Sequence, residues 1–371
     1  MNFDEAPVLI FWETTRACGL ACRHCRAEAV PYPLPGQLSP AESVRLIDQF
    51  AGFRPRRPVL VLTGGDVMTR PDLFELVERA RQVGLPVALA PSVTPRLEEG
   101  ALAHLRDLGV ESVSISLDGA DAATHDGVRR VPGHFEDTLV AFRRLRSLGF
   151  KLQVNTTAMG SNVSQLAAIA AIVEEVGATS WEVFFLVKVG RGQAEQELSA
   201  GDNEDVAHFL FDASRYGFAV RSVEGPWCRR VAAWRRTLPP STDPAAAFSL
   251  GPLYRHLTSE LVRLMGQPRG EPRLASAGTR DGHGIFFIAH DGTAYPAGFL
   301  PLPLANVRDE DPAAIYRKHP LLVAIRQARF SGRCGRCEFR EICGGSRARA
   351  FAASGDPLGE DPACGYPALS H

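Results

Sequence analysis

The chain has 371 residues, of which 45% are hydrophobic and 22% charged, a composition that fits a globular protein with a substantial core and excludes a disordered chain. Its 41 basic and 42 acidic residues leave a formal net charge of -1, so no global field draws in nucleic acid or an anionic membrane. The apolar run near the amino terminus is too short for a signal sequence or a membrane span. We therefore expect a cytoplasmic protein with no nucleic-acid and no membrane partner.

From about residue 7 to residue 190, short β-branched runs alternate with longer amphipathic stretches, which is typical of repeated βα units around a parallel sheet. Several of the expected helices begin with a Ser, Asp or Asn cap. The α/β pattern predicts a partial (β/α)6 TIM-like barrel rather than a closed one. The expected strands are 8–14, 59–62, 87–90, 112–117, 152–156 and 180–186, and the expected helices are 40–50, 72–83, 98–108, 135–148 and 163–176.

The pattern loosens after residue 191, where we expect a bridging region with one helix at 204–216. Further on, 285–288 and 294–296 predict a hairpin, because the Asp291-Gly292 pair between them tolerates the positive φ of a tight turn. The chain thus divides into a barrel core at 1–192, a bridging region at 193–278 and a small cysteine-rich C-terminal domain at 279–371.

Three cysteines, Cys18, Cys22 and Cys25, lie close together in the loop that follows the first predicted strand. Loops after the carboxyl ends of barrel strands line the active site, so a metal centre held here would face the barrel mouth. Three thiolates can bind three irons of a [4Fe-4S] cluster and leave the fourth iron open to another ligand. By spacing alone, a zinc site is the competing interpretation.

Two further features bear on this choice: His24 stands directly before the third cysteine, and the second predicted strand ends in Gly64-Gly65-Asp66. Together with the cysteine spacing they resemble the radical S-adenosylmethionine (SAM) superfamily, whose motif has an aromatic residue and a Gly-Gly-Glu element at these places. Glycines without a Cβ let the backbone approach a ligand, and a nearby acid or carbonyl can accept from its ammonium group. The resemblance implies that the open iron binds SAM.

Residues at later strand ends complete the SAM site that the resemblance implies. Hydroxyl, amide and carboxylate groups there would lie near the ribose and carboxylate of SAM, Arg129 would contact the SAM carboxylate, and Leu186 would supply an apolar contact to adenine. Taken alone, each is more often a capping, turn or core residue. The predicted cofactor-binding residues are His24, Gly64, Gly65, Asp66, Ser92, Thr94, Ser116, Asp118, Arg129, Asn155 and Leu186.

A second cysteine group, Cys334, Cys337, Cys343 and Cys364, lies near the C-terminal end. Four thiolates suffice for a second [4Fe-4S] cluster or for zinc, and the spacing leaves both open. The chain from about residue 7 to Cys364 resembles radical SAM proteins with a SPASM or twitch extension, which implies an auxiliary [4Fe-4S] cluster on these four residues.

A full SPASM extension binds two auxiliary clusters, and this chain departs from that pattern. Ala297 and Ser346 stand where relatives carry cysteines, which implies a single auxiliary cluster here. Cys228 stands alone and is interpreted as an ordinary thiol.

The resemblance implies an enzyme that reductively cleaves SAM to a 5'-deoxyadenosyl radical, with electrons from a flavodoxin or ferredoxin, and abstracts hydrogen from a substrate. The region around Ser346 and Asp361 resembles both the enzymes of alternative haem and haem d1 formation and the pyrroloquinoline quinone type of peptide maturase. The resemblance implies a tetrapyrrole side chain or a peptide as candidate substrates and does not identify the substrate. Only seventeen residues precede Cys18, so no fused peptide-recognition element is expected there. A zinc-stabilised binding protein and an iron-sulfur sensor without SAM cleavage are the alternatives.

Overall fold

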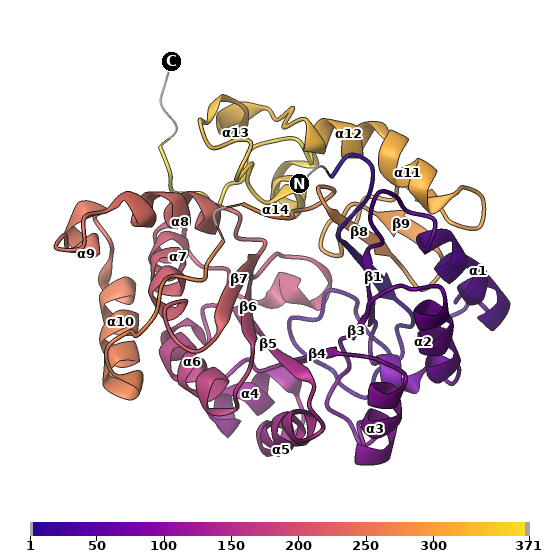
Figure 1. The fold of residues 1–371 in the computed structure, drawn as a ribbon. Coiled ribbons are helices and arrows are strands. Elements are labelled where there is room, and N and C mark those ends of the chain that lie inside the picture. Colours follow the sequence, from indigo (N-terminus) through magenta and orange to yellow (C-terminus); the bar gives the residue numbers. More distant parts are fainter. Residues whose placement is uncertain (1–2, 276, 368–371) are drawn as a thin grey trace.

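The computed structural model describes residues 3–275 and 277–367, and its strands form one ten-stranded sheet in the order β10-β9-β8-β1-β2-β3-β4-β5-β6-β7 (Figure 1). Strands β1 to β8 pair in parallel, whereas β9 and β10 are antiparallel. The strands are β1 (Leu9–Glu13), β2 (Val59–Thr63), β3 (Val87–Leu89), β4 (Ser112–Ser116), β5 (Lys151–Ala158), β6 (Ser180–Phe185), β7 (Ala219–Val223), β8 (Ile285–Ile288), β9 (Thr293–Tyr295) and β10 (Ala305–Asn306).

Helices follow most of the parallel strands and surround the sheet, as Figure 1 shows. All six predicted strands and all five predicted barrel helices are present, with bounds that differ by a few residues at most, and the mixed α/β class is confirmed. The α-helices are α1 (Pro40–Phe50), α2 (Leu73–Gln82), α3 (Glu99–Asp107), α4 (Ala122–Arg129), α5 (His134–Ser147), α6 (Leu166–Glu175), α7 (Ala200–Ala213), α8 (Trp227–Thr237), α9 (Pro244–Ala247), α10 (Pro252–Met265), α11 (Pro312–Lys318), α12 (Pro320–Arg326), α13 (Gly332–Arg336) and α14 (Arg347–Ser354), and short 3-10 turns lie at η1 (Val67–Thr69), η2 (Val163–Gln165) and η3 (Gly190–Ala194).

Helix α1 shows why the barrel helices could be predicted. The Ser39 side chain accepts from the Glu42 amide while the Glu42 side chain accepts from the Ser39 amide, and Pro40 occupies the first turn. Such a capping box satisfies amides that the helix itself leaves without partners. The buried face of the helix then carries Leu46, Ile47 and Phe50.

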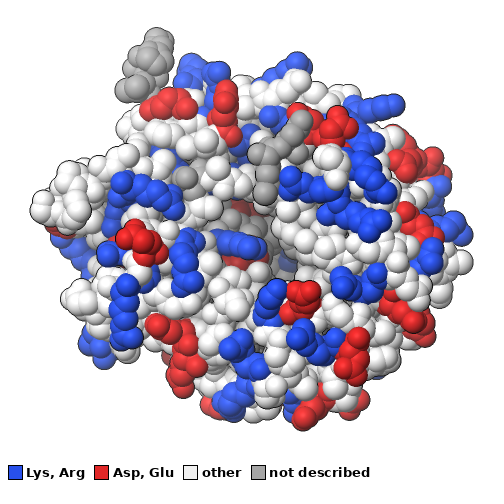
Figure 2. Space-filling view, viewed as in Figure 1, with Lys and Arg blue, Asp and Glu red and all other residues white. Residues whose placement is uncertain are grey.

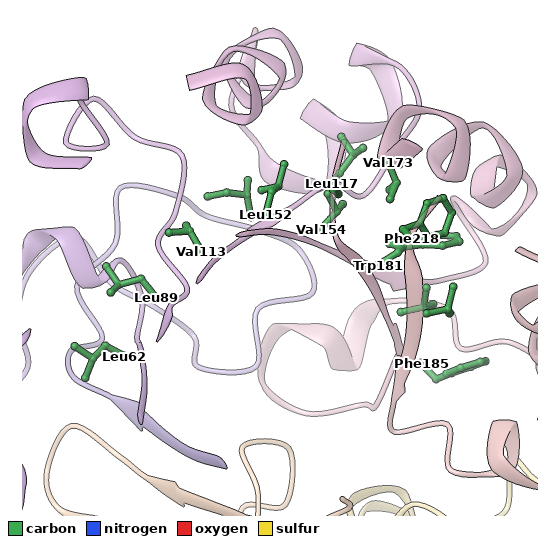
Figure 3. Close-up of a cluster of buried hydrophobic side chains, with 14 of the residues drawn as sticks. Leu62, Leu89, Val113, Leu117, Leu152, Val154, Val173, Trp181, Phe185 and Phe218 are labelled. Atoms are coloured by element: carbon green, nitrogen blue, oxygen red, sulfur yellow. The ribbon is translucent and has the colours of Figure 1, made fainter. Parts of the chain in front are cut away.

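The main core lies between the sheet and the outer helices. Side chains of β5 alternate, so that Leu152 and Val154 are buried while Gln153 and Asn155 are half-buried on the other face. Figure 3 shows Leu152, Val154 and Trp181 on the strands, near Val173 of α6. The face of β5 that carries Gln153 and Asn155 therefore lines the interior of the barrel.

Strand pairing crosses both predicted segment boundaries. β7, from the predicted bridging region, pairs with β6, and β8, from the predicted C-terminal domain, pairs with β1 through Leu9 and Ile285. The predicted hairpin is confirmed as β8 and β9. Strand β7 and helices α4, α8 and α10 were not predicted, and α4 and α8 turn out to carry residues of the two cysteine sites.

The surface carries both signs of charge. Figure 2 shows basic and acidic side chains interspersed over the face in view, in keeping with the near-zero net charge. Among the described helices, none has the combined length and apolar character that crossing a membrane requires.

Candidate functional site

The first cysteine group lies in the loop after β1, where the carboxyl ends of the parallel strands meet. Cys18 and Cys22 are buried and Cys25 is half-buried, and the three pack together with Leu20 and Ala29. The loop is fixed to its own far end, because the Cys18 amide donates to the Val30 carbonyl at 2.8 Å. The three cysteines thus lie in the loop between β1 and α1, as predicted.

The backbone of Gly64 and Gly65 packs directly against the start of the cysteine loop. The Gly65 amide donates to the Thr15 carbonyl at 2.8 Å and the Asp66 amide to the Ala17 carbonyl at 2.7 Å. A Cβ on Gly64 would lie 2.5 Å from the Thr15 oxygen, and one on Gly65 would lie 2.4 Å from the Ala17 oxygen. The close approach that requires glycine is thus an approach to the cysteine loop itself, whereas the sequence had suggested an approach to a ligand.

The Asp66 carboxylate ties the end of β2 to the loop after β3. It accepts from the Thr94 hydroxyl at 2.8 Å, the Met68 amide at 3.1 Å and the Ser92 amide at 3.3 Å. Burial raises the pKa of Asp66, and these hydrogen bonds oppose that rise. Ser92 in turn donates to the Gly65 carbonyl at 3.0 Å and lies 3.6 Å from the Cys18 sulfur. Three predicted strand-end residues therefore share one network beside the first cysteine.

Asp118, Arg129 and His24 form a second network beside Cys22. Arg129 donates from Nη1 to the Cys22 Sγ at 3.5 Å and from Nη2 to Asp118 Oδ2. His24 Nε2 lies 2.9 Å from the same carboxylate oxygen, and Asp118 Oδ1 accepts from the Thr157 amide at 2.8 Å. Burial alone would raise the pKa of Asp118, but Arg129 and His24 hold it well below its usual range. The guanidinium is therefore committed to a carboxylate and a thiol.

Two histidines that the sequence analysis missed support this network. The Asp118 amide donates to His125 Nδ1 at 3.1 Å, which places the His125 proton on Nε2, 2.9 Å from His134 Nδ1. His134 Nε2 then lies 3.0 Å from the Val93 carbonyl. Burial lowers the pKa of His125 to about 3, so the pair is neutral. The two imidazoles link the end of β4 to the loop after β3, and no sequence period would have pointed to them.

The remaining predicted residues lie around the barrel interior. Ser116 and Asn155 are partners in the register of β4 and β5, and Asn155 Oδ1 accepts from Gln153 at 2.8 Å. Leu186 is buried against Val128 and Met159 beside α4. The structure thus brings all the predicted residues to one end of the sheet, while their contacts with SAM stay a prediction.

The second cysteine group gathers around α13 and the segment after α14. Cys334 Sγ accepts from the Asp361 amide at 3.4 Å, and Cys337 Sγ accepts from the Phe339 amide at 3.4 Å. The Cys364 thiol interacts electrostatically with the thiols of Cys334 and Cys343, and the Cys337 thiol interacts with that of Cys334. Burial raises the pKa of Cys343 to about 12. Each of the four thiols thus interacts with at least one other member of the group.

Cys228, which the sequence left alone, is fully buried in α8 near Cys343. Burial raises the pKa of Cys228 to about 12, and its side chain interacts with Ser222. Cys228 is therefore a buried thiol close to the second cysteine group, and its interpretation as an ordinary thiol stays a prediction.

Ser346 and Ala297 are the two positions at which the resemblance implies the loss of a second auxiliary cluster. Ser346 caps α14, pairs through its hydroxyl with Glu224 and donates from its amide to Asp361 at 2.8 Å. Burial and the neighbouring Asp281 raise the pKa of Glu224 well above its usual range, so one carboxyl of the Glu224–Asp281 pair retains a proton. A buried acid pair therefore occupies the surroundings of Ser346, while Ala297 is buried as well.

The chemistry of the donor sets can be compared with the predicted clusters. Each thiolate of a [4Fe-4S] cluster binds a different iron. The donor set of three thiols in one group and four in the other suits one open and one closed cluster.

Comparisons with known proteins agree with this geometry. The family model described as "Radical SAM superfamily" matches residues 12–173. The chain is 35% identical to an AdoMet-dependent heme synthase of Nitratidesulfovibrio vulgaris, over 98% of this chain and 94% of that protein. It is 28% identical to a pre-heme d1 synthase of Dinoroseobacter shibae, over 96% of this chain and 86% of the other.

A solved structure of Streptococcus suis SuiB bound to its precursor peptide SuiA superposes with a TM-score of 0.69 at 14% identity, covering 98% of this chain and 76% of SuiB. At that identity the likeness concerns the fold, and it extends over both cysteine groups.

Proposed function

Because this chain belongs to the radical SAM superfamily, we propose that it is a SAM-cleaving enzyme acting on the side chains of a tetrapyrrole. The observation that carries the substrate class is the full-length identity of 35% to a heme synthase, which exceeds the 29% identity to a mycofactocin maturase. Peptide maturation is the second candidate, favoured by the fold shared with a peptide-bound enzyme.

The residues of the first site have distinct roles in this proposal. Cys18, Cys22 and Cys25 would hold three irons of a [4Fe-4S] cluster and leave the fourth iron open to SAM. Once reduced by an external flavodoxin or ferredoxin, that cluster would supply the electron for reductive cleavage of SAM. Asp66 fixes the loop that carries Ser92 and Thr94, and Asp118 orients His24 and Arg129. Both carboxylates are almost fully buried, which keeps these contacts from competing with water.

Aromatic side chains near the barrel mouth support a flat aromatic substrate. Phe299 lies beside Phe184 with ring centroids 5.9 Å apart, and Phe287 lies 6.1 Å from Tyr295. The Arg26 guanidinium stands 4.5 Å from the Phe287 ring and 6.0 Å from the Phe299 ring. A tetrapyrrole offers a π-face for such rings and carboxylates for a guanidinium, so this cluster suits it better than an unspecified peptide.

Arg26 is already paired in the structure, which bears on how it would bind substrate. Its guanidinium lies 3.2 Å from Glu13, and His290 lies 3.5 Å from the same carboxylate. Burial opposes ionisation of Glu13, but Arg26 lowers its pKa. A substrate carboxylate would share Arg26 with Glu13, and His290 would then hold the Glu13 carboxylate.

Electron entry is proposed at the outer face of the cysteine loop. A cavity of about 300 Å³ there is lined by Arg23, Arg130, Arg191 and Glu195, among others. Arg191 donates to the Cys22 carbonyl at 2.9 Å, so the cavity borders the backbone of a cluster ligand. An excess of basic groups suits the acidic surface of a flavodoxin or ferredoxin reductant.

The second group, Cys334, Cys337, Cys343 and Cys364, is proposed to hold an auxiliary [4Fe-4S] cluster. With four protein thiolates, no iron is left open to substrate. Electron transfer rather than substrate binding is therefore its proposed role.

The test is anaerobic reconstitution with iron and sulfide, followed by SAM, dithionite and a porphyrin that carries propionate side chains. We expect 5'-deoxyadenosine to form together with an equal molar amount of porphyrin of altered mass. The Arg26→Gln variant should weaken porphyrin binding, read from the porphyrin absorption band, while Arg263→Gln on the far helix α10 should not. Formation of 5'-deoxyadenosine without any porphyrin binding would refute the substrate class and leave the SAM chemistry intact.

A further inference from the structure

Three buried arginines surround the second cysteine group. Arg229 in α8, Arg280 before β8 and Arg347 in α14 are 8%, 7% and 1% exposed. They come from three segments that are far apart in the chain. Arg280 nevertheless interacts electrostatically with Arg229, Arg347 and Cys343, and Arg229 interacts with Cys343 as well. Their convergence is therefore a property of the folded C-terminal half.

These guanidinium groups contact carbonyl oxygens rather than acids. Arg229 donates to the Ile342 carbonyl at 3.1 Å, and Arg280 donates to the Glu341 carbonyl at 2.6 Å. Arg347 donates to the Gly359 carbonyl at 2.6 Å. None of the three takes part in an ion pair within the part of the chain that the structure describes.

The nearest carboxyl group does not supply the missing charge in full. Asp281 neighbours these arginines, but it shares a buried acid pair with Glu224, in which one proton is retained. By contrast, the neighbouring Arg230 has a carboxylate of its own, since Glu204 accepts two hydrogen bonds from it at 2.8 and 2.6 Å. The three arginines thus differ from Arg230 in lacking a dedicated anion.

One guanidinium nitrogen lies near the thiols without a partner. Arg347 Nη2 is buried without a hydrogen-bond partner among the described residues. It lies 2.7 Å from the position that a Cβ on Gly345 would take, and the Cys334 Sγ lies 2.9 Å from that same position. Because Gly345 has no side chain, none stands between this guanidinium and the Cys334 thiol.

Buried cations are costly unless an anion compensates them, and removing the compensating partner is strongly destabilising. Neutral thiols would not provide that anion. Metal binding deprotonates thiols, and a [4Fe-4S] cluster with four thiolates carries a net charge of about -2 when oxidised. Such a cluster would match the buried positive charge.

We infer that Arg229, Arg280 and Arg347 are the counter-charge of an anionic iron-sulfur centre on Cys334, Cys337, Cys343 and Cys364, and that they make this centre easier to reduce than the first cluster. Reduction adds one electron and no proton, so the net charge changes from about -2 to about -3 and the three cations stabilise the product. This inference rests on the auxiliary cluster of the proposed function.

The test uses the full chain with Cys18, Cys22 and Cys25 replaced by alanine, so that the auxiliary centre is the sole EPR signal, in a redox titration with dithionite. Arg347→Gln and Arg229→Gln should each shift the reduction equilibrium at least tenfold against the reduced form, which is about 59 mV for one electron. Arg347→Lys should restore most of the shift. Arg263→Gln, which alters an exposed ion pair on α10, should leave the potential unchanged.

Two results would overturn the inference: unchanged potentials in both glutamine variants, or zinc in place of iron in this background. If Arg347→Gln fails to retain iron, Arg229→Gln and Arg347→Lys still decide the matter. The SAM assay on the unmodified protein is independent, so a failure of SAM cleavage with the predicted potential shifts would reject the proposed function alone.

Discussion

The two cysteine groups use the same ligand atoms in opposite electrostatic settings. Beside the first group, the one buried guanidinium in contact with a thiol is Arg129, and Asp118 neutralises it within the described structure. Around the second, the buried Arg229, Arg280 and Arg347 form no ion pair among the described residues. A cluster is easier to reduce where cations are uncompensated, so in the function proposed above the first site would donate an electron and the second would accept one.

The largest effect is expected when one cysteine ligand of the first group is removed. Cys22→Ala should abolish 5'-deoxyadenosine formation with dithionite, because SAM loses its iron. Bound iron should fall from about eight to about four per chain, with the auxiliary EPR signal kept. Residual SAM cleavage at the unmodified rate would contradict the assignment of the first site.

Removal of a ligand from the second group should separate the two activities. Cys343→Ala should retain SAM cleavage with dithionite but lose most substrate conversion, since the substrate radical has no acceptor. Cys228→Ala is the matched control, because that thiol is also fully buried and adjacent. It should keep about eight irons per chain and full turnover. Equal loss of both activities in Cys343→Ala would argue for a structural role of the second group.

The glycines under the first group offer a milder perturbation. Gly64→Ala places a Cβ 2.5 Å from the Thr15 carbonyl, so the cysteine loop must shift. We expect a loss of about 1–3 kcal/mol in unfolding free energy and partial loss of iron from the first site alone. Gly100→Ala in α3 has open space around the new Cβ and should stabilise the protein by roughly 0.5–1 kcal/mol. Denaturant unfolding and iron analysis measure both.

The smallest effect is expected at the surface. Arg130→Glu reverses a charge in the cavity at the outer face of the cysteine loop and should slow electron delivery by a reduced flavodoxin about tenfold at low salt. Turnover with dithionite should not change, because a small reductant needs no docking site. Stopped-flow reduction at two ionic strengths checks this, and an equal effect with both reductants would exclude docking.

The sequence predicted the barrel because its signals are local. Ser39, Pro40 and Glu42 mark the start of α1, and buried side chains recur along β5 at every second residue. Strand β7 was missed because it is short and the region around it is rich in Pro, Arg and Ala, and α4 was missed because Gly127 interrupts its pattern.

The cysteine ligands could be recognised because their spacing is itself a pattern. Their surroundings could not, since each depends on residues far apart in the chain. Arg229 lies more than a hundred residues before Cys343, and the His125 and His134 imidazoles meet only once β4 and α5 are packed. Charge compensation between residues that are far apart in the chain produces no periodic pattern and no fixed spacing in the sequence.

The parallel pairing of β1 with both β2 and β8 has a consequence for how the chain can be divided. Cutting away the segment from β8 onward would not release a self-sufficient barrel. It would expose the backbone donors and acceptors of Leu9 to Trp12 as a new sheet edge, beside the apolar side chains of Ile10 and Trp12. Such an exposed edge promotes aggregation, so a truncated barrel should be insoluble. Hybrids with other enzymes of this fold should be joined at loops that keep β8 paired with β1.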